Sequence, residues 1–281
     1  MKALAILLTV HNRRENTLRC LQCVNAQLPV SGVEVDIYMT DDGCTDGTAE
    51  TVSKRFPDVH IIKGDGGLYW NRGMIAAWEA AAKQKGYDYY LWLNDDTYIF
   101  PTAISQMLQS AKETNDQAII AGATQSEDNG TCTYGLMKEG TDHLLVPNGY
   151  LQEGHSLNGN FVLIPRRVYD ALGMLDPHYH HAGGDTDYGL RAKEAGIKVL
   201  LDKAYCGYCE EHPTLSKWCN PDVPLPERWR NLNQPLGMPL KILFYHERRH
   251  YGLPIACFHV CTTVAHCLFP QIWVRFKHPS S

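Results

Sequence analysis

Apolar runs that stop at polar residues recur along the first half of the chain. Residues 3–10 are almost wholly apolar and lead into the polar segment 11–14, and the run over 33–39 stops just before Asp41 and Asp42. Strands buried on both faces of a parallel sheet have this pattern. The same pattern predicts further strands over 59–62, 87–93, 118–121, 161–164 and 198–201.

Helical spacing fills the intervals between these runs. Leu18, Leu21 and Val24 recur on one helix face and predict a helix over 16–27. Similar patterns predict helices over 48–56, 71–85, 101–114, 167–172 and 187–195. The alternation of strands and helices indicates an α/β fold, with a mostly parallel sheet and helices on both of its faces.

The last third of the chain has a different character. Residues 213–239 contain six prolines and predict an extended connector, and 240–281 predict a helical tail. Residues 240–250 are basic and amphipathic, and 252–274 carry no Asp, Glu, Lys or Arg. Three interpretations stay open: peripheral contact of 240–278 with the inner membrane face, packing on the rest of the chain or on a second copy in a homo-oligomer, and a membrane span.

The overall composition is that of a globular protein. Hydrophobic residues make up 44% of the 281 residues and charged residues 20%. The formal net charge of −5 argues against nucleic acid as a partner. Ten cysteines are scattered along the chain, and no small-residue cleavage site follows the first apolar run. We therefore expect a cytoplasmic protein with free thiols, with the inner membrane face as an alternative location.

Two adjacent carboxylates follow the predicted strand over 87–93. Asp95 and Asp96 repel each other. A hard cation such as Mg²⁺ or Mn²⁺ would remove that repulsion and also bind phosphate oxygens. The alternative is a helix cap in front of the helix that Pro101 begins.

A second acidic segment, 40–48, lies between a predicted strand and a predicted helix. Asp41 or Asp42 would accept hydrogen bonds from a base or a ribose, as acidic residues do in other nucleotide-binding units. A turn followed by a cap from Asp46 or Thr48 explains the segment without any ligand, and taken alone the segment favours that interpretation. Both acidic pairs fall at the carboxyl ends of predicted parallel strands, which is where such sheets bind ligands.

Four segments together resemble glycosyltransferase family 2, which has the GT-A fold. They are residues 8–13, 41–46, 93–96 and 183–191, and they come in the order of the family within residues 3–212. The resemblance implies a catalytic domain over 1–212, with a nucleotide-binding half over 1–121 and an acceptor half over 122–212. Within the family, the chain resembles bacterial rhamnosyltransferase-like and polysaccharide-biosynthesis members.

The resemblance also implies an activity. The chain is expected to be an inverting, metal-dependent glycosyltransferase of the hexosyltransferase type. The donor would be a nucleotide-diphosphate-sugar, the acceptor hydroxyl would belong to a glycan or a lipid-linked sugar, and the pathway would be surface polysaccharide biosynthesis. The implied cofactor is Mg²⁺ or Mn²⁺. The implied nucleotide-sugar site consists of Thr9, His11, Arg13, Asp41, Asp42, Arg72 and Asp95, and the implied metal site of Asp96 and His212.

The expected catalytic base lies in segment 183–191. Family members usually read Glu-Asp where this chain has Gly184-Asp185. Inverting transfer needs one carboxylate to take the acceptor proton, and we expect Asp185 to be that group. Asp187 is the other candidate, either as the base or as the cap of the helix that follows. The loop 158–160 resembles the acceptor-side loop of the family.

Two further clusters leave alternatives open. His178, His180 and His181 suggest a metal site, an acceptor contact or simply a solvated loop. Cys206, Cys209 and Cys219 would form a zinc site together with His212, although the chain has a single C-x-x-C pair here. Donor-metal binding by His212 and ordinary packing are the competing interpretations.

Two other functions compete with sugar transfer. A nucleotidyltransferase acting on a sugar phosphate also uses paired carboxylates, but it would need a glycine-rich loop after the first strand, and residues 11–15 contain no glycine. A catalytically silent nucleotide-sugar-binding module would keep the fold without activity. The presence of Asp95, Asp96 and Asp185 argues against such decay.

Overall fold

The computed structural model describes residues 1–141, 143–211 and 215–272. The chain divides into two compact units. The first contains Met1–Pro177 and Gly184–Glu211, and the second contains His178–Gly183 and the described residues after Glu211.

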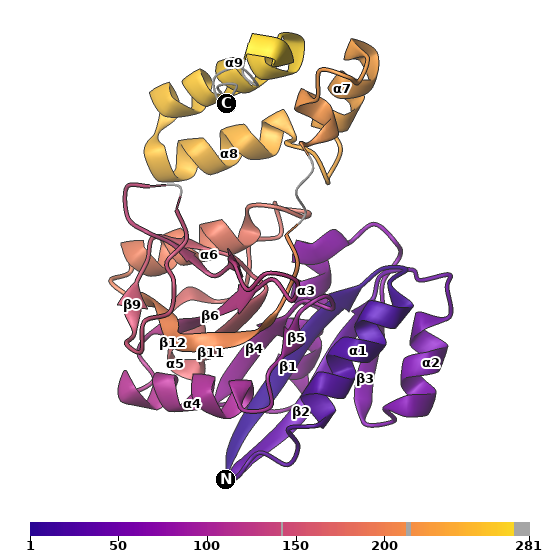
Figure 1. The fold of residues 1–281 in the computed structure, drawn as a ribbon, viewed down its shortest axis with the longest axis vertical. Coiled ribbons are helices and arrows are strands. Elements are labelled where there is room, and N and C mark those ends of the chain that lie inside the picture. Colours follow the sequence, from indigo (N-terminus) through magenta and orange to yellow (C-terminus); the bar gives the residue numbers. More distant parts are fainter. Residues whose placement is uncertain (142, 212–214, 273–281) are drawn as a thin grey trace. The chain divides into compact units, whose positions relative to one another are not determined.

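A large mixed sheet forms the centre of the first unit (Figure 1). Its main strands are β1 (Lys2–Val10), β2 (Val33–Asp41), β3 (Val59–Lys63), β4 (Tyr89–Leu93), β5 (Tyr98–Ile99), β6 (Ile119–Gln125), β11 (Phe161–Pro165) and β12 (Val199–Tyr208). They lie in the order β3-β2-β1-β4-β11-β6-β12-β5. The pairs of β1 with β2, β2 with β3, β1 with β4 and β6 with β12 are parallel. The predicted mostly parallel sheet is therefore confirmed, with β11 running antiparallel between β4 and β6 and with β5 antiparallel to β12.

Short strands fill the region in which the sequence pattern was weak. Strand β7 (Cys132–Tyr134) pairs with β6, and β9 (Gln152–Glu153) pairs with β12. Strands β8 (Leu136–Met137) and β10 (Ser156–Leu157) form a separate two-stranded sheet. Runs of two or three residues are too short for a period to show in the sequence.

Helices cover both faces of the main sheet, as predicted. They are α1 (Arg14–Asn25), α2 (Thr48–Arg55), α3 (Tyr69–Gln84), α4 (Ala103–Glu113), α5 (Arg166–Leu172) and α6 (Gly184–Glu194). Strand β1 shows why its sequence is apolar throughout: Leu4, Ile6 and Leu8 belong to the core that contains α1 and α4 residues. Ala5 and Leu7 face the opposite core, which contains residues of α3, α5 and α6.

Packed aromatic rings support the beginning of α3. The wholly buried Trp92 of β4 lies 5.2 Å from Tyr188 and 5.7 Å from Trp78, measured between ring centroids. Trp70, in the first turn of α3, meets Trp92 edge-on at 5.9 Å. Such pairs contribute roughly 0.5–1.5 kcal/mol each beyond their buried area. The aromatic core therefore fixes Trp70 at the carboxyl end of β4.

The second unit is helical. It contains a short 3₁₀ turn (Lys217–Cys219), α7 (Leu225–Leu232), α8 (Leu240–Tyr251) and α9 (Leu253–Leu268). The expected helical tail is confirmed for α8 and α9, and residues 273–281 lie outside the described residues. Within residues 1–141, 143–211 and 215–272, no helix has the length and apolar character needed to span a bilayer.

The prediction of an extended connector over 213–239 is wrong for 225–232, which form α7. Pro226 lies in the first turn of that helix, where its missing N–H costs no hydrogen bond. The buried Arg228 then ties the helix down, donating from Nε to the carbonyl of Cys267 at 2.9 Å and from a terminal nitrogen to that of Val223 at 2.9 Å. The number of prolines alone therefore does not show that this segment is extended.

Candidate functional site

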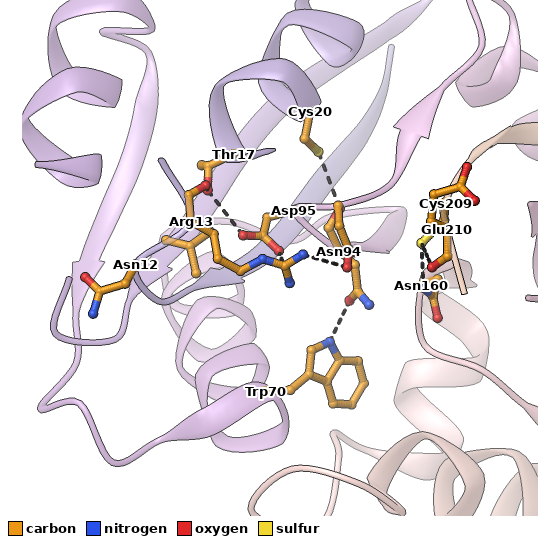
Figure 2. Close-up of polar contacts among 12 residues, drawn as sticks. Asn12, Arg13, Thr17, Cys20, Trp70, Asn94, Asp95, Asn160, Cys209 and Glu210 are labelled. Carbon is orange, nitrogen blue, oxygen red and sulfur yellow. Dashed lines mark hydrogen bonds and ion pairs between the residues drawn. The ribbon is translucent and has the colours of Figure 1, made fainter. Parts of the chain in front are cut away.

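Arg13 bridges the two carboxylates that follow β4. Because β1 and β4 are parallel neighbours, their carboxyl ends meet at one edge of the sheet. One terminal nitrogen of Arg13 lies 3.1 Å from Asp95 Oδ1, and the other lies 2.8 Å from Asp96 Oδ2. Figure 2 shows the side chain of Arg13, which directly precedes α1, reaching toward Asp95. The guanidinium of Arg13 thus supplies a positive charge to the acidic pair that was predicted to need a cation.

Burial and charge act together on these groups. The pKa of Asp95 is raised to about 6, chiefly because burial outweighs the favourable charge of Arg13, and the charge of the neighbouring Asp96 acts in the same direction as burial. The Thr17 hydroxyl, which donates to Asp95 Oδ2 at 3.3 Å, acts in the opposite direction. Burial also lowers the pKa of Arg13, but the charges of Asp95 and Asp96 outweigh that effect and raise it. Arg13 is therefore held in its charged form.

A divalent cation fits the chemistry of this pair but not the arrangement seen here. Carboxylate oxygens are the ligands that Mg²⁺ and Mn²⁺ prefer. Arg13, however, engages one oxygen of Asp95 and one of Asp96. No group of three or more His, Cys, Asp or Glu side chains within the described ranges is arranged to hold a metal. The other expected ligand, His212, lies outside the described residues.

Asp42, at the end of β2, anchors the segment that leads into α3. Its Oδ1 accepts backbone hydrogen bonds from Gly66 at 2.9 Å and Leu68 at 3.2 Å, and its Oδ2 accepts one from Tyr69 at 2.8 Å. Tyr69 has a φ of 56°, an unfavourable conformation for a residue with a side chain. The carboxylate of Asp42 therefore holds a strained turn in place. Asp41 is engaged as well, since its Oδ1 accepts from the backbone N–H of Cys44 at 2.9 Å.

Thr9 and His11 lie beside these acids. Thr9 pairs in register with Thr40 on β2, and a Cβ added at Gly73 of α3 would lie 2.1 Å from its hydroxyl oxygen. His11 Nδ1 lies 2.6 Å from the backbone carbonyl oxygen of Asp42. The ends of β1, β2 and β4 therefore bring together six of the seven residues expected to bind the donor: Thr9, His11, Arg13, Asp41, Asp42 and Asp95.

The seventh, Arg72, is in the first turn of α3. Its Nε donates to the backbone carbonyl of Pro177 at 3.0 Å. The helix that carries Arg72 begins at Tyr69, directly after the turn that Asp42 holds. The turn held by Asp42 thus links Arg72 to the residues at the end of β2 that were expected to bind the donor.

Asp185 is linked to the acidic pair through a chain of contacts. It lies in the first turn of α6, where its oxygens accept backbone hydrogen bonds from Gly159 at 2.9 Å and Thr186 at 2.8 Å. A Cβ added at Gly159 would lie 3.3 Å from the Cβ of Asp185 and 2.4 Å from the ring of Trp70. Trp70 Nε1 in turn donates to Asn94 Oδ1 at 2.7 Å, and Asn94 directly precedes Asp95. Residues from four distant segments therefore lie together.

The two candidate bases have different environments. Burial raises the pKa of Asp185, and its hydrogen bonds with the backbone of Thr186 and Gly159 oppose that effect. Asp187 is wholly buried and forms an ion pair with Arg191, one turn later, at 2.8 Å. Arg191 also donates to the backbone carbonyls of Leu172 and Met174. Through Arg191, Asp187 thus helps to hold α6 against the end of α5.

Two residues of this region, Trp70 and Asn94, were not assigned a role of their own from the sequence. Asn160 was expected only as part of the acceptor-side loop 158–160. The backbone N–H of Asn94 donates to the carbonyl of Asn160 at 2.9 Å, and Asn160 Nδ2 lies 3.5 Å from Cys209 Sγ (Figure 2). The signal in the sequence was position, because Asn94 directly follows β4, Asn160 directly precedes β11, and Trp70 lies in the first turn of α3.

The histidine and cysteine clusters are distributed over both units. His178, His180 and His181 belong to the second unit, where the ring of His178 stacks on Tyr245 at 4.5 Å. Cys206 is buried in a core of the first unit, and Cys209 lies beside Asn160. Cys219 belongs to the second unit. All ten cysteines are free thiols.

Comparisons with known proteins agree with this architecture. The sequence model of glycosyl transferase family 2 matches residues 5–173. No curated protein sequence matches the chain. Among solved structures, the crystal structure of S. aureus TarS, residues 1–349, is similar with a TM-score of 0.53 and 13% sequence identity. The match covers 100% of this chain and 74% of the TarS chain. The expected GT-A fold is confirmed.

The role of Asp42 gives a testable prediction. In Asp42→Asn one oxygen acceptor becomes an amide N–H₂ that faces a backbone donor, so the free energy of unfolding should fall by about 1–3 kcal/mol. Urea denaturation measures this change. The matched control is Asp65→Asn, because the exposed Asp65 accepts a single backbone hydrogen bond, from Gly67. Equal stability of the two variants would show that Asp42 does not hold the turn.

Proposed function

The chain belongs to glycosyl transferase family 2, and we propose that it transfers a sugar from a nucleotide-diphosphate-sugar donor to an acceptor hydroxyl with inversion. We expect the acceptor to be a glycan or a lipid-linked sugar and the pathway to be surface polysaccharide biosynthesis. One observation supports this proposal most strongly. Asp185 of α6 is connected to the Asp95-Asp96 pair through Gly159, Trp70 and Asn94.

We propose Asp185 as the base. The acceptor oxygen forms a bond with the anomeric carbon, the bond from that carbon to the diphosphate oxygen breaks, and the acceptor proton goes to Asp185. Two backbone N–H groups orient this carboxylate. Burial raises its pKa toward the working pH, which favours a general base. Asp187 does not suit the role, because it is wholly buried against Arg191.

The donor would occupy the carboxyl ends of β1, β2 and β4. Thr9, His11 and Asp42 would contact the base, and Asp41 would support Asp42. Arg13 and Arg72 carry the positive charge for the diphosphate, because guanidinium groups bind phosphate oxygens with two parallel hydrogen bonds. A Mg²⁺ or Mn²⁺ ion at Asp96 would offset the charge on the leaving diphosphate.

Purified protein tests the assignment of the base. With a panel of nucleotide-sugars, the wild type should release nucleoside diphosphate in the presence of an acceptor. We expect Asp185→Asn to lower kcat by about 100-fold or more while the melting temperature changes little. Asp187→Asn should instead lower stability by about 3 kcal/mol, because it leaves Arg191 buried without its charged partner.

Two results would contradict this account. Full transfer activity in Asp185→Asn would exclude Asp185 as the base. Tight nucleotide binding by the wild type, with no turnover of any donor in the panel, would favour a silent binding module.

The raised pKa of Asp185 predicts the acidic limb of the pH profile. The base acts in its unprotonated form, so kcat should be maximal above its pKa and fall about tenfold per pH unit below it. Because burial raises that pKa, the fall should begin above the ordinary value of 3.8. The limb is measured from kcat between pH 4 and 9 and should move in Asp185→Glu. A limb that stays in place in that variant would assign it to another group.

The second unit exposes an apolar surface on and after α9. Its exposed apolar side chains are Leu253, Ile255, Phe258, Leu268, Phe269 and Ile272. Three basic residues of α8, Lys241, Arg248 and Arg249, are exposed as well. Apolar side chains together with basic residues suit an anionic lipid surface. We therefore propose that α8 and α9 bind the cytoplasmic face of a membrane, where a lipid-linked acceptor would lie.

Vesicle sedimentation tests this surface. The protein should bind vesicles rich in phosphatidylserine, bind neutral phosphatidylcholine vesicles less, and release at high salt. Phe258→Asp should weaken binding about tenfold or more, because a phenyl side chain loses roughly 1.5–3 kcal/mol of burial. Tyr150→Asp, at an exposed aromatic residue of the first unit, is the control.

Other outcomes would contradict the membrane proposal. Equal vesicle binding by Phe258→Asp and the control would exclude the surface of α9. Concentration-dependent association of the wild type in solution, abolished by Phe258→Asp, would identify this surface as the interface of a homo-oligomer instead.

A further inference from the structure

Arg13 balances two carboxylates that would otherwise be unfavourable together. The side chain of Asp95 is 5% exposed and that of Asp96 is 14% exposed, and the two residues are adjacent. Removing two like charges from water without a counter-charge is costly. The guanidinium meets one oxygen of each, at 3.1 and 2.8 Å. The guanidinium of Arg13 therefore supplies positive charge to both carboxylates.

The backbone that carries Arg13 is fixed on both sides. Asn12 has a φ of 51°, and its side-chain oxygen accepts the backbone N–H of Thr45 at 2.7 Å. The carbonyl of Arg13 accepts a hydrogen bond from the N–H of Thr17 at 2.9 Å, and it shares the proton of the Thr17 hydroxyl, at 3.0 Å, with Asp95. The side chain of Arg13, in contrast, is 38% exposed. The guanidinium can therefore leave the carboxylates by side-chain rotation while the loop stays in place.

Two kinds of ligand compete for the groups involved. A divalent cation competes with Arg13 for the oxygens of Asp95 and Asp96. A diphosphate competes with those carboxylates for the guanidinium, because phosphate oxygens match its paired donors. A divalent cation alone would take the carboxylates from Arg13, and a diphosphate alone would take Arg13 from the carboxylates. When the two ligands bind together, the cation pairs with the carboxylates and the diphosphate pairs with Arg13.

We propose that Arg13 is a resident counter-cation that excludes a divalent cation from Asp95 and Asp96 until a diphosphate draws the guanidinium away. Metal binding and diphosphate binding are then coupled, and the coupling is reciprocal. The identity of the diphosphate rests on the proposed function. The exclusion of the metal by Arg13 does not rest on the proposed function. An experiment with the metal alone can therefore contradict the exclusion while the proposed sugar transfer stands, and the transfer can be contradicted while the exclusion stands.

Titration with Mn²⁺ alone, followed by the electron paramagnetic resonance signal of the free ion, tests the exclusion. Wild-type protein should bind Mn²⁺ weakly, and Arg13→Gln should bind it about 10- to 100-fold more tightly, because the competing charge-assisted hydrogen bonds are lost. Arg13→Lys keeps the charge and should stay close to the wild type. Arg14→Gln is the matched control, since Arg14 pairs with Glu15 and donates to the Asp46 carbonyl. It should bind as the wild type does.

Thermal unfolding gives a second readout. Arg13→Gln should melt at a lower temperature than the wild type, and Mn²⁺ should restore the loss in the variant while changing the wild type little. An additional Asp96→Asn substitution should abolish the gain in Mn²⁺ affinity. These arms need neither a sugar donor nor turnover.

Several outcomes would overturn the proposal. One is an Arg13→Gln affinity for Mn²⁺ equal to that of the wild type. Another is an equal gain in Arg14→Gln, which would reflect net charge rather than position. If Arg13→Gln does not fold, the wild type alone decides. Tight Mn²⁺ binding that Asp96→Asn abolishes, in the absence of any phosphate compound, would show that Arg13 excludes nothing.

Discussion

Crowded negative charge at one edge of the sheet is the constraint on which this site depends. Parallel strands β1, β2 and β4 end at the same edge of the sheet, so the acidic residues at the ends of β2 and β4 lie at that edge together. Hydrogen-bond donors from the same chain contact these carboxylates. Asp42 accepts three backbone N–H groups, and Arg13 bridges Asp95 and Asp96. Asp185 accepts two backbone N–H groups at the start of α6. The acids are thereby fixed before any ligand arrives.

The sequence predicted the sheet and its acidic edge for physical reasons. Strand β1 has to be apolar on both sides because helices cover both faces, and a run of that kind is visible in any single sequence. Asp41 and Asp95 could be expected to lie close together because parallel strands share their carboxyl ends. Those inferences need only the local pattern of apolar residues and the parallel topology that the pattern predicts.

Other features depend on contacts between distant residues, which no local pattern shows. The bridge from Arg13 requires the exact direction of a long side chain across a neighbouring strand. The pairing of Asp187 with Arg191 could be predicted from their spacing of one helical turn. The complete burial of Asp187 and the contact of Arg191 with the carbonyl of Leu172 in α5 could not. The helix α7 was missed because proline counts ignore that the first turn of a helix tolerates proline.

A crystal structure of the protein with a nucleoside diphosphate and Mn²⁺ tests the central claim most directly. The account predicts that the bound nucleotide lies at the ends of β1, β2 and β4, with its diphosphate between Arg13 and Asp96 and with Asp185 facing the same bound molecule. A nucleotide bound on another surface, with Arg13 still bridging Asp95 and Asp96, would contradict the assignment of this edge as the active site.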